Sequence, residues 1–181
     1  MEDIERHESK YLGSGDKKKH ILLTSYIKSL LKNDRVIEAA FFQEELLMLK
    51  PEHRQVHALG YEIAIRSFNY KNVVMYDDFL SKNKKCKEEL LKLRVKYFYS
   101  IQHSIYLEAT INELLPILKF DKGYFPILVE SIFFNRSIRN IKSLLIFLRK
   151  NSLKLDPKTE TNVKKIAYEK LCDQLVRVAN G

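Results

Sequence analysis

Chain-breaking residues are scarce in this sequence of 181 residues, which has 5 glycines, 4 prolines and no tryptophan. A β-sandwich or β-barrel needs many tight turns, and tight turns favour Gly and Pro. Enzymes that bind phosphate groups commonly hold them in glycine-rich loops. The composition therefore disfavours both a turn-rich all-β fold and an enzyme of that kind.

Cysteines and long apolar runs are also few. Cys86 and Cys172 do not make a disulfide framework, so we expect free thiols in a reducing compartment. No apolar run reaches the roughly 20 residues that cross a bilayer. The first twenty residues carry five acidic and five basic side chains around no hydrophobic centre, which is unlike a secretory signal. We expect a soluble intracellular protein of the nucleus or cytoplasm, without a membrane partner.

Apolar residues recur with a spacing close to 3.6 along almost the whole chain, as on one face of an α-helix. The first stripe lies between His20 and Leu31, and the polar residues from Asn33 to Arg35 separate it from a second stripe that stops at Pro51. No segment shows the period of two of a strand. The pattern predicts an all-α fold with short connections, hence antiparallel hairpins. The expected helices lie near residues 21–31, 36–50, 52–67, 70–82, 87–101, 105–119, 124–135, 138–152 and 159–178.

The hairpins show signs of internal repetition. Ala39 lies 12 positions before Pro51, and Leu145 lies 12 positions before Pro157. The two prolines are 106 residues apart, which is three steps of about 35. The intermediate steps from Ala39 fall on Val74 and Ala109. Such self-similarity predicts a solenoid of helical hairpins.

Two segments carry a resemblance to a known family. The stretch from Asn33 through Phe42 to Leu49-Lys50-Pro51 resembles the second helix of a tetratricopeptide repeat, and Leu153-Lys154-Leu155-Asp156-Pro157 resembles the end of another. The resemblance implies a right-handed superhelix of about four tetratricopeptide-like hairpins plus a C-terminal capping helix. The expected parts are a polar N-terminal segment (1–19), four repeats (20–51, 52–86, 87–121 and 122–157) and the capping helix (158–181).

A narrower likeness covers residues 20–100. The run from Ala39 to Leu47, followed by Leu59-Gly60-Tyr61 and the helix from Glu89 to Tyr97, is similar to the N-terminal region of the tetratricopeptide subunits of the anaphase-promoting complex. In that family these repeats form a homodimer interface. The likeness implies a non-catalytic scaffold that binds protein partners, homodimerises, and belongs to a ubiquitin ligase of the cell cycle.

The first helix pair is the expected dimer interface. No repeat precedes its outer face, and the polar N-terminal segment has too few apolar residues to cap it. The interface residues that we predict are Leu22, Tyr26, Phe41 and Phe42. A concave groove lined by the first helix of each hairpin would hold a peptide partner against Leu30, Tyr61 and Ile65, beside Tyr26.

Candidate catalytic and metal-binding groups are sparse. His53 and His57 share one helix face, but no Glu follows His53 and no third ligand lies near in sequence, so a solvent-facing helix is expected. Asp77 and Asp78 would point about 100° apart on a helix, which makes a poor acid–base pair. We predict no metal site, no cofactor, no small-molecule substrate and no enzymatic activity.

The net charge of +9 is concentrated in segments 82–96 and 136–154. In the second segment, we expect the core-facing side of the helix to hold Leu144, Leu145 and Leu148, so that the basic residues cannot all share one face. The basic residues of that helix are Arg139, Lys142, Arg149 and Lys150. Protein partners are therefore favoured over nucleic acid. Two alternatives stay open: a bacterial secretion chaperone or peptide-binding adaptor with tetratricopeptide repeats, and a basic helical-repeat protein that binds nucleic acid.

Overall fold

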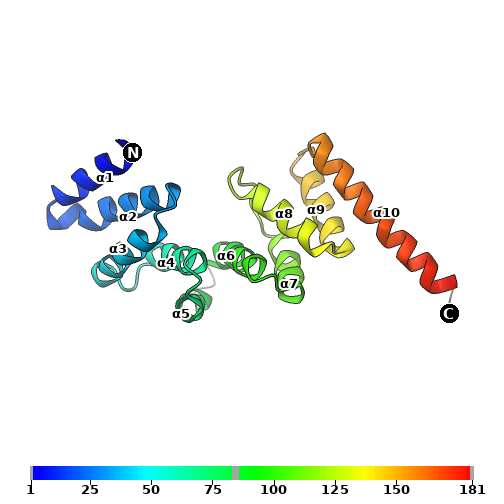
Figure 1. Ribbon diagram of the computed structural model, residues 1–181, viewed down its shortest axis with the longest axis horizontal. Helices are drawn as coiled ribbons and strands as arrows, with labels where there is room; N and C mark the ends of the chain where they lie inside the picture. The colour runs from blue at the N-terminus through cyan, green and yellow to red at the C-terminus, as the bar shows by residue number, and fades with distance from the viewer. Residues whose placement is uncertain (1, 83–85, 180–181) are drawn as a thin grey trace. The chain divides into compact units, whose positions relative to one another are not determined.

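The prediction of an all-α fold is confirmed by the computed structural model, which describes residues 2–82 and 86–179. Within these ranges every regular element is a helix and no strand occurs. The helices are α1 (Glu2–Leu12), α2 (Asp16–Lys32), α3 (Val36–Leu49), α4 (Arg54–Arg66), α5 (Tyr70–Ser81), α6 (Lys87–Ser100), α7 (Ser104–Leu114), α8 (Phe125–Asn135), α9 (Ile138–Lys150) and α10 (Pro157–Ala179) (Figure 1). Over the same ranges, none of these helices combines the length and the apolar character that a bilayer crossing requires.

Four helix-to-helix turns have the same backbone geometry at intervals of 34 residues. Asp34, Phe68, Gln102 and Arg136 have positive φ angles of 61°, 55°, 54° and 50°. After the first three, the amide of the next residue donates to a carbonyl five residues back, at 2.9 Å in each turn. This left-handed residue with its long backward bond is the Schellman ending of a helix.

The helices that follow these turns begin in register. Val36, Tyr70, Ser104 and Ile138 are their first residues, again 34 apart. In three of them the residue before the helix caps it: the side chains of Asn69, His103 and Ser137 accept a hydrogen bond from the backbone amide three residues on. Such capping satisfies an amide that the helix itself leaves unpaired. Local turn chemistry therefore fixes where these four helices start.

The same period governs the buried residues. Leu46, Leu80, Leu114 and Leu148 are 34 residues apart and all buried. Ala39 has buried counterparts at the same step, namely Val73, Leu107 and Ile141. The sequence analysis assumed a repeat of about 35 residues, which made Val74, Ala109 and Leu145 the counterparts of Ala39. That repeat length was wrong, because these three residues are exposed whereas Ala39 is buried. A shift of one residue turns a helical position by about 100°, which moves it from the core to the surface.

Two helix boundaries differ from the expected ones for reasons of proline chemistry. α7 ends at Leu114 and not near residue 119, because Pro116 lacks the amide and has a ring that a helix interior cannot accommodate. α10 begins at Pro157, where a missing amide costs nothing. The carboxylate of Asp156 accepts hydrogen bonds from the amides of Lys158 and Thr159, at 3.1 and 3.0 Å.

The chain divides into two units, Met1–Leu93 and Arg94–Gly181. In the first unit α1 packs on α2, α2 on α3, α3 on α4 and α4 on α5. In the second unit α7 contacts α8 and α9, and α10 contacts α9. Val163 and Ile166 of α10 are buried. Cys86 and Cys172 are free thiols.

Candidate functional site

The outer face of the first helix pair is covered by α1, which corrects the expectation of a polar segment too poor in apolar groups to cap it. Ile4 and Tyr11 lie seven residues apart on one face of α1, and both are buried in the core that α2 and α3 form. The apolar residues Ile4 and Tyr11 at i and i+7, two helical turns apart, are the sequence signal that could have revealed this helix.

Three aromatic rings join α1, α2 and α3. Tyr11 stacks on Tyr26 with ring centroids 6.0 Å apart, and Phe42 meets Tyr26 edge to face at 4.9 Å. The hydroxyl of Tyr26 donates to Glu8 at 3.2 Å. Edge-to-face and offset ring pairs stabilise a fold beyond the burial of their area. Tyr26 is therefore a core residue, and Leu22 and Phe42 are half-buried against the same cluster.

A polar triad fastens α1 to α3 at the rim of this cluster. The hydroxyl of Tyr11 donates to Glu45 at 2.6 Å, and the Lys19 ammonium lies 2.7 Å from the other carboxylate oxygen. Burial, and then the hydrogen bond to Glu45, raises the pKa of Tyr11 to about 12. The hydrogen bonds from Lys19 and Tyr11 lower the pKa of Glu45 below its usual value. The triad favours the ionised carboxylate at neutral pH.

One predicted interface residue, Phe41, lies in an exposed apolar stripe. Ile37, Phe41 and Met48 occupy one face of α3 at i, i+4 and i+11, and they are 86%, 70% and 81% exposed. Glu44 completes the face at i+7 and is also exposed. Single exposed apolar residues are ordinary, but three in line on one helix form a patch.

The predicted peptide groove is not available in this structure. Leu30, Tyr61 and Ile65 are all buried within the chain's own core. The Tyr61 hydroxyl donates to Asp77 at 2.9 Å. That prediction was wrong because the first helix of each hairpin points these apolar residues at its neighbours and not at solvent.

The candidate catalytic groups have structural surroundings. His57 is buried, and not solvent-facing as expected: its ring stacks on Phe79 at 3.4 Å and its Nε2 lies 2.5 Å from the Pro51 carbonyl oxygen. Asp77 faces Tyr61 while Asp78 is exposed, so these carboxylates diverge. Across residues 2–82 and 86–179, no cluster of three His, Cys, Asp or Glu side chains has a metal-binding arrangement.

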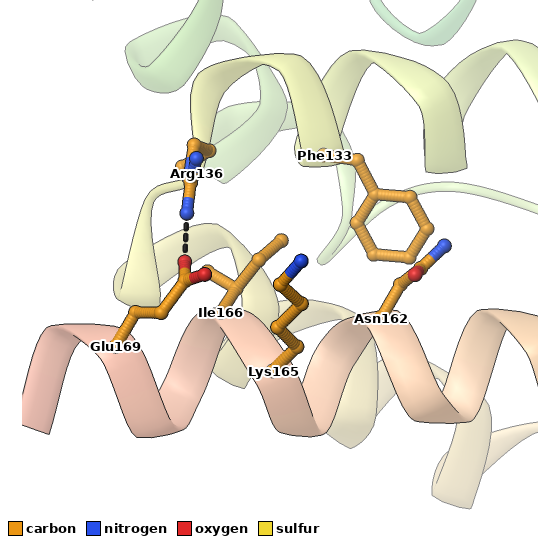
Figure 2. A pocket seen from close by; sticks show the side chains of 6 residues that line it. All are labelled: Phe133, Arg136, Asn162, Lys165, Ile166 and Glu169. Carbon is orange, nitrogen blue, oxygen red and sulfur yellow. Dashed lines mark hydrogen bonds and ion pairs between the residues drawn. The ribbon is translucent and has the colours of Figure 1, made fainter.

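A shallow pocket of about 190 Å³ lies between α8 and α10. Its lining residues are Phe133, Arg136, Asn162, Lys165, Ile166 and Glu169 (Figure 2). Arg136 and Glu169 form an ion pair across the pocket, so the charges of these two side chains neutralise each other. Lys165 is the other charged side chain of the lining.

The two basic segments differ in how their charges are used. In segment 82–96, Lys84 and Lys85 lie outside the described residues. Lys92 pairs with Glu88 at 3.1 Å, and Glu89 of the same helix pairs with Arg54 at 3.3 Å. This segment is therefore tied into local ion pairs.

Segment 136–154 presents its charges together, against our expectation. The four basic residues of α9 are all exposed, and at about 100° per residue they fall within an arc of about 100°. The expectation was wrong because Leu145 lies at the edge of this face and is exposed, whereas Leu144 and Leu148 enter the core. The residues of this cationic face are Arg139, Lys142, Arg149 and Lys150.

The chain matches no family model, no curated protein and no solved structure. Among the described residues, the α3 stripe and the cationic face of α9 are two surfaces whose chemistry suggests a partner.

Proposed function

We propose that this chain is a non-catalytic protein-interaction module, a right-handed superhelix of tetratricopeptide-like hairpins that binds through the outer face of α3. The single observation that carries the proposal is the exposure of Ile37, Phe41 and Met48 on one helix face. Apolar patches of this kind on a folded surface mark protein contacts.

Three features that recur along the chain support a fold of tetratricopeptide-like repeats. Turn geometry, helix starts and buried leucines all return after 34 residues, which is the length of a tetratricopeptide repeat. Repeats of this type are extended scaffolds that present binding surfaces.

A second copy of the chain is the partner that we propose for the stripe. The stripe spans three turns of one helix, with the aromatic Phe41 between two aliphatic ends. A two-fold axis would bring two such stripes together in antiparallel fashion, so each end of one would cover the opposite end of the other. Phe41 is the one aromatic residue of this stripe, and large aromatic residues are typical hot spots of such contacts.

The absence of catalysis in this proposal rests on where the candidate groups lie. His57 packs against Phe79, and Asp77 is held by Tyr61. Membership in a cell-cycle ubiquitin ligase stays a prediction of the sequence resemblance alone.

The experiment is light scattering over a roughly tenfold range of protein concentration. We expect the wild type to form a dimer of about 43 kDa, twice the chain mass of 21.4 kDa, and Phe41→Glu to be a monomer. The matched control is Ile105→Glu, because Ile105 is equally exposed but lies on α7. Circular dichroism checks that each variant is folded. A wild type that is monomeric throughout, or a dimer unaffected by Phe41→Glu, contradicts self-association through α3.

A further inference from the structure

The charge of this chain is distributed unevenly between its two units. The segment 1–93 carries 17 Lys and Arg against 15 Asp and Glu, whereas the segment 94–181 carries 15 against 8. The second unit therefore holds a net charge of +7 out of the total of +9. No acidic residue occurs between Arg136 and Lys154, so the excess is greatest at α9.

The cationic face of α9 is not explained by the stability of its own helix. Arg139 is in the first turn, where the helix dipole disfavours a positive charge. Lys142 follows it at i+3, so the two like charges repel on neighbouring positions. Only Arg149 and Lys150, in the last turn, are placed favourably for the dipole. An anionic partner would relieve both unfavourable features.

The cations of this face have no competing partner among the residues that the structure describes. Arg139, Lys142, Arg149 and Lys150 make no ion pair or side-chain hydrogen bond there, unlike Arg136, which is paired with Glu169. Their charges are free to meet an external anion.

Two exposed aliphatic residues lie within the same surface. Ile146 is 68% exposed and sits between Lys142 and Arg149 along the helix, and Leu145 beside it is 44% exposed. At 1.5 Å per residue, the two cations are about 10 Å apart on either side of Ile146. The surface thus has an apolar centre and a charged rim, which is the usual anatomy of a protein–protein contact.

We propose that this surface, the four cations with Leu145 and Ile146, binds an acidic amphipathic segment of a partner protein. Carboxylates of the segment would pair with the cations at both ends of α9, and its apolar side chains would cover the aliphatic pair. A phosphate backbone would meet the cations but leave the aliphatic pair uncovered. A lipid surface would gain little from two aliphatic residues. This inference is independent of the proposed function, which uses α3 in the other unit.

The test measures binding of a fluorescent peptide to the full chain by anisotropy, at about 0.15 M NaCl. The probe is an alanine-based helix of about 18 residues with two Leu on one face and two Glu toward each end of that face. One matched peptide replaces Leu by Ala, and another replaces Glu by Gln. We expect the complete probe to bind about tenfold tighter than either matched peptide.

Variants of the chain locate the contact. Arg139→Glu with Arg149→Glu should weaken binding of the probe at least about tenfold, and Ile146→Ser about threefold. The control, Lys122→Glu with Lys158→Glu, makes the same change in net charge at exposed residues outside α9, and should alter binding less than about threefold. All these side chains are exposed, so the fold should tolerate the changes.

Four outcomes would overturn the proposal. Equal binding of the alanine-matched peptide would show that charge alone is recognised. Tighter binding of a single-stranded RNA 20-mer of uridine would assign the face to nucleic acid, and tighter binding of phosphatidylserine vesicles would assign it to membranes. An equal effect of the control substitutions would place the contact elsewhere. A light-scattering result that contradicts self-association through α3 would not alter the peptide-binding results for α9. The two proposals can therefore be refuted independently.

Discussion

Gly60 shows how a single residue sets the distance between two helices. It lies on α4 where the ring of Tyr76, from α5, packs against the backbone. A Cβ at this position would lie 2.6 and 2.7 Å from Oη and Cε1 of that ring, which is too close for real atoms. Because Tyr76 is itself buried, its ring has little room to move aside.

We therefore expect Gly60→Ala to destabilise the chain by about 1–2 kcal/mol, although alanine favours a helix by about 1 kcal/mol over glycine. Urea unfolding measures the free energy directly. Gly15→Ala is the control, since a Cβ at Gly15 has nothing within 4 Å, and it should change stability by less than about 0.5 kcal/mol. Adding Tyr76→Leu should cancel part of the Gly60→Ala cost; fully additive effects would contradict the contact.

At the scale of the element, α1 is held on the bundle by few groups. Its apolar anchors are Ile4 and Tyr11, and its polar contacts are those of Tyr11 with Glu45 of α3 and of Glu8 with Tyr26 of α2. A helix of this length is marginal by itself in water, so its order depends on this docking. The attachment of α1 is therefore the step that pH and mutation should affect first.

Acidic pH should weaken the attachment of α1 to the bundle, because it protonates Glu45. The pKa of Glu45 is lowered in the folded state, so its contribution to stability is complete above its ordinary value of 4.5 and is lost as pH falls through the lowered value. We expect Glu45→Gln to reduce stability at pH 7, and the difference from the wild type to vanish in acid. Hydrogen exchange of the α1 amides between pH 7 and pH 3 measures this. A difference that persists unchanged at the lowest pH would contradict the role of the carboxylate.

At the scale of the whole chain, the recurring leucines are divided between the two units. Leu46 lies in the first unit and Leu148 in the second, at the same position of their respective hairpins. In repeat proteins each hairpin is stabilised by its neighbours, so a defect is felt locally and fades with distance along the chain.

We expect Leu46→Ala and Leu148→Ala each to cost about 2–5 kcal/mol, since both truncate a buried side chain. Hydrogen exchange should show lost protection in α2 to α4 for the first variant and in α8 to α10 for the second. The two variants serve as controls for each other. Uniform loss over the whole chain in either variant would mean a single cooperative core.

The sequence by itself determined that the chain is helical and where most of its helices lie. Apolar spacing predicted the helices from α2 onward but missed α1, and Pro51 correctly marked the stop of α3. The cap residues Asn69, His103 and Ser137 are local signals that need no tertiary contact. The common face of the α9 cations was not predicted, because the sequence analysis placed Leu145 in the core and the structure exposes it.

Only the tertiary structure decided which apolar residues are covered. Tyr26, Leu30 and Tyr61 are buried while Ile37 and Phe41 are exposed, although all five are apolar residues on helices. Periodicity assigns a face to each residue, but the neighbour that covers that face comes from elsewhere in the chain, as α1 does for α2 and α3. Burial is thus a property of long-range packing, which is why Tyr26 of the expected interface became core while Phe41 stayed exposed in the stripe of α3.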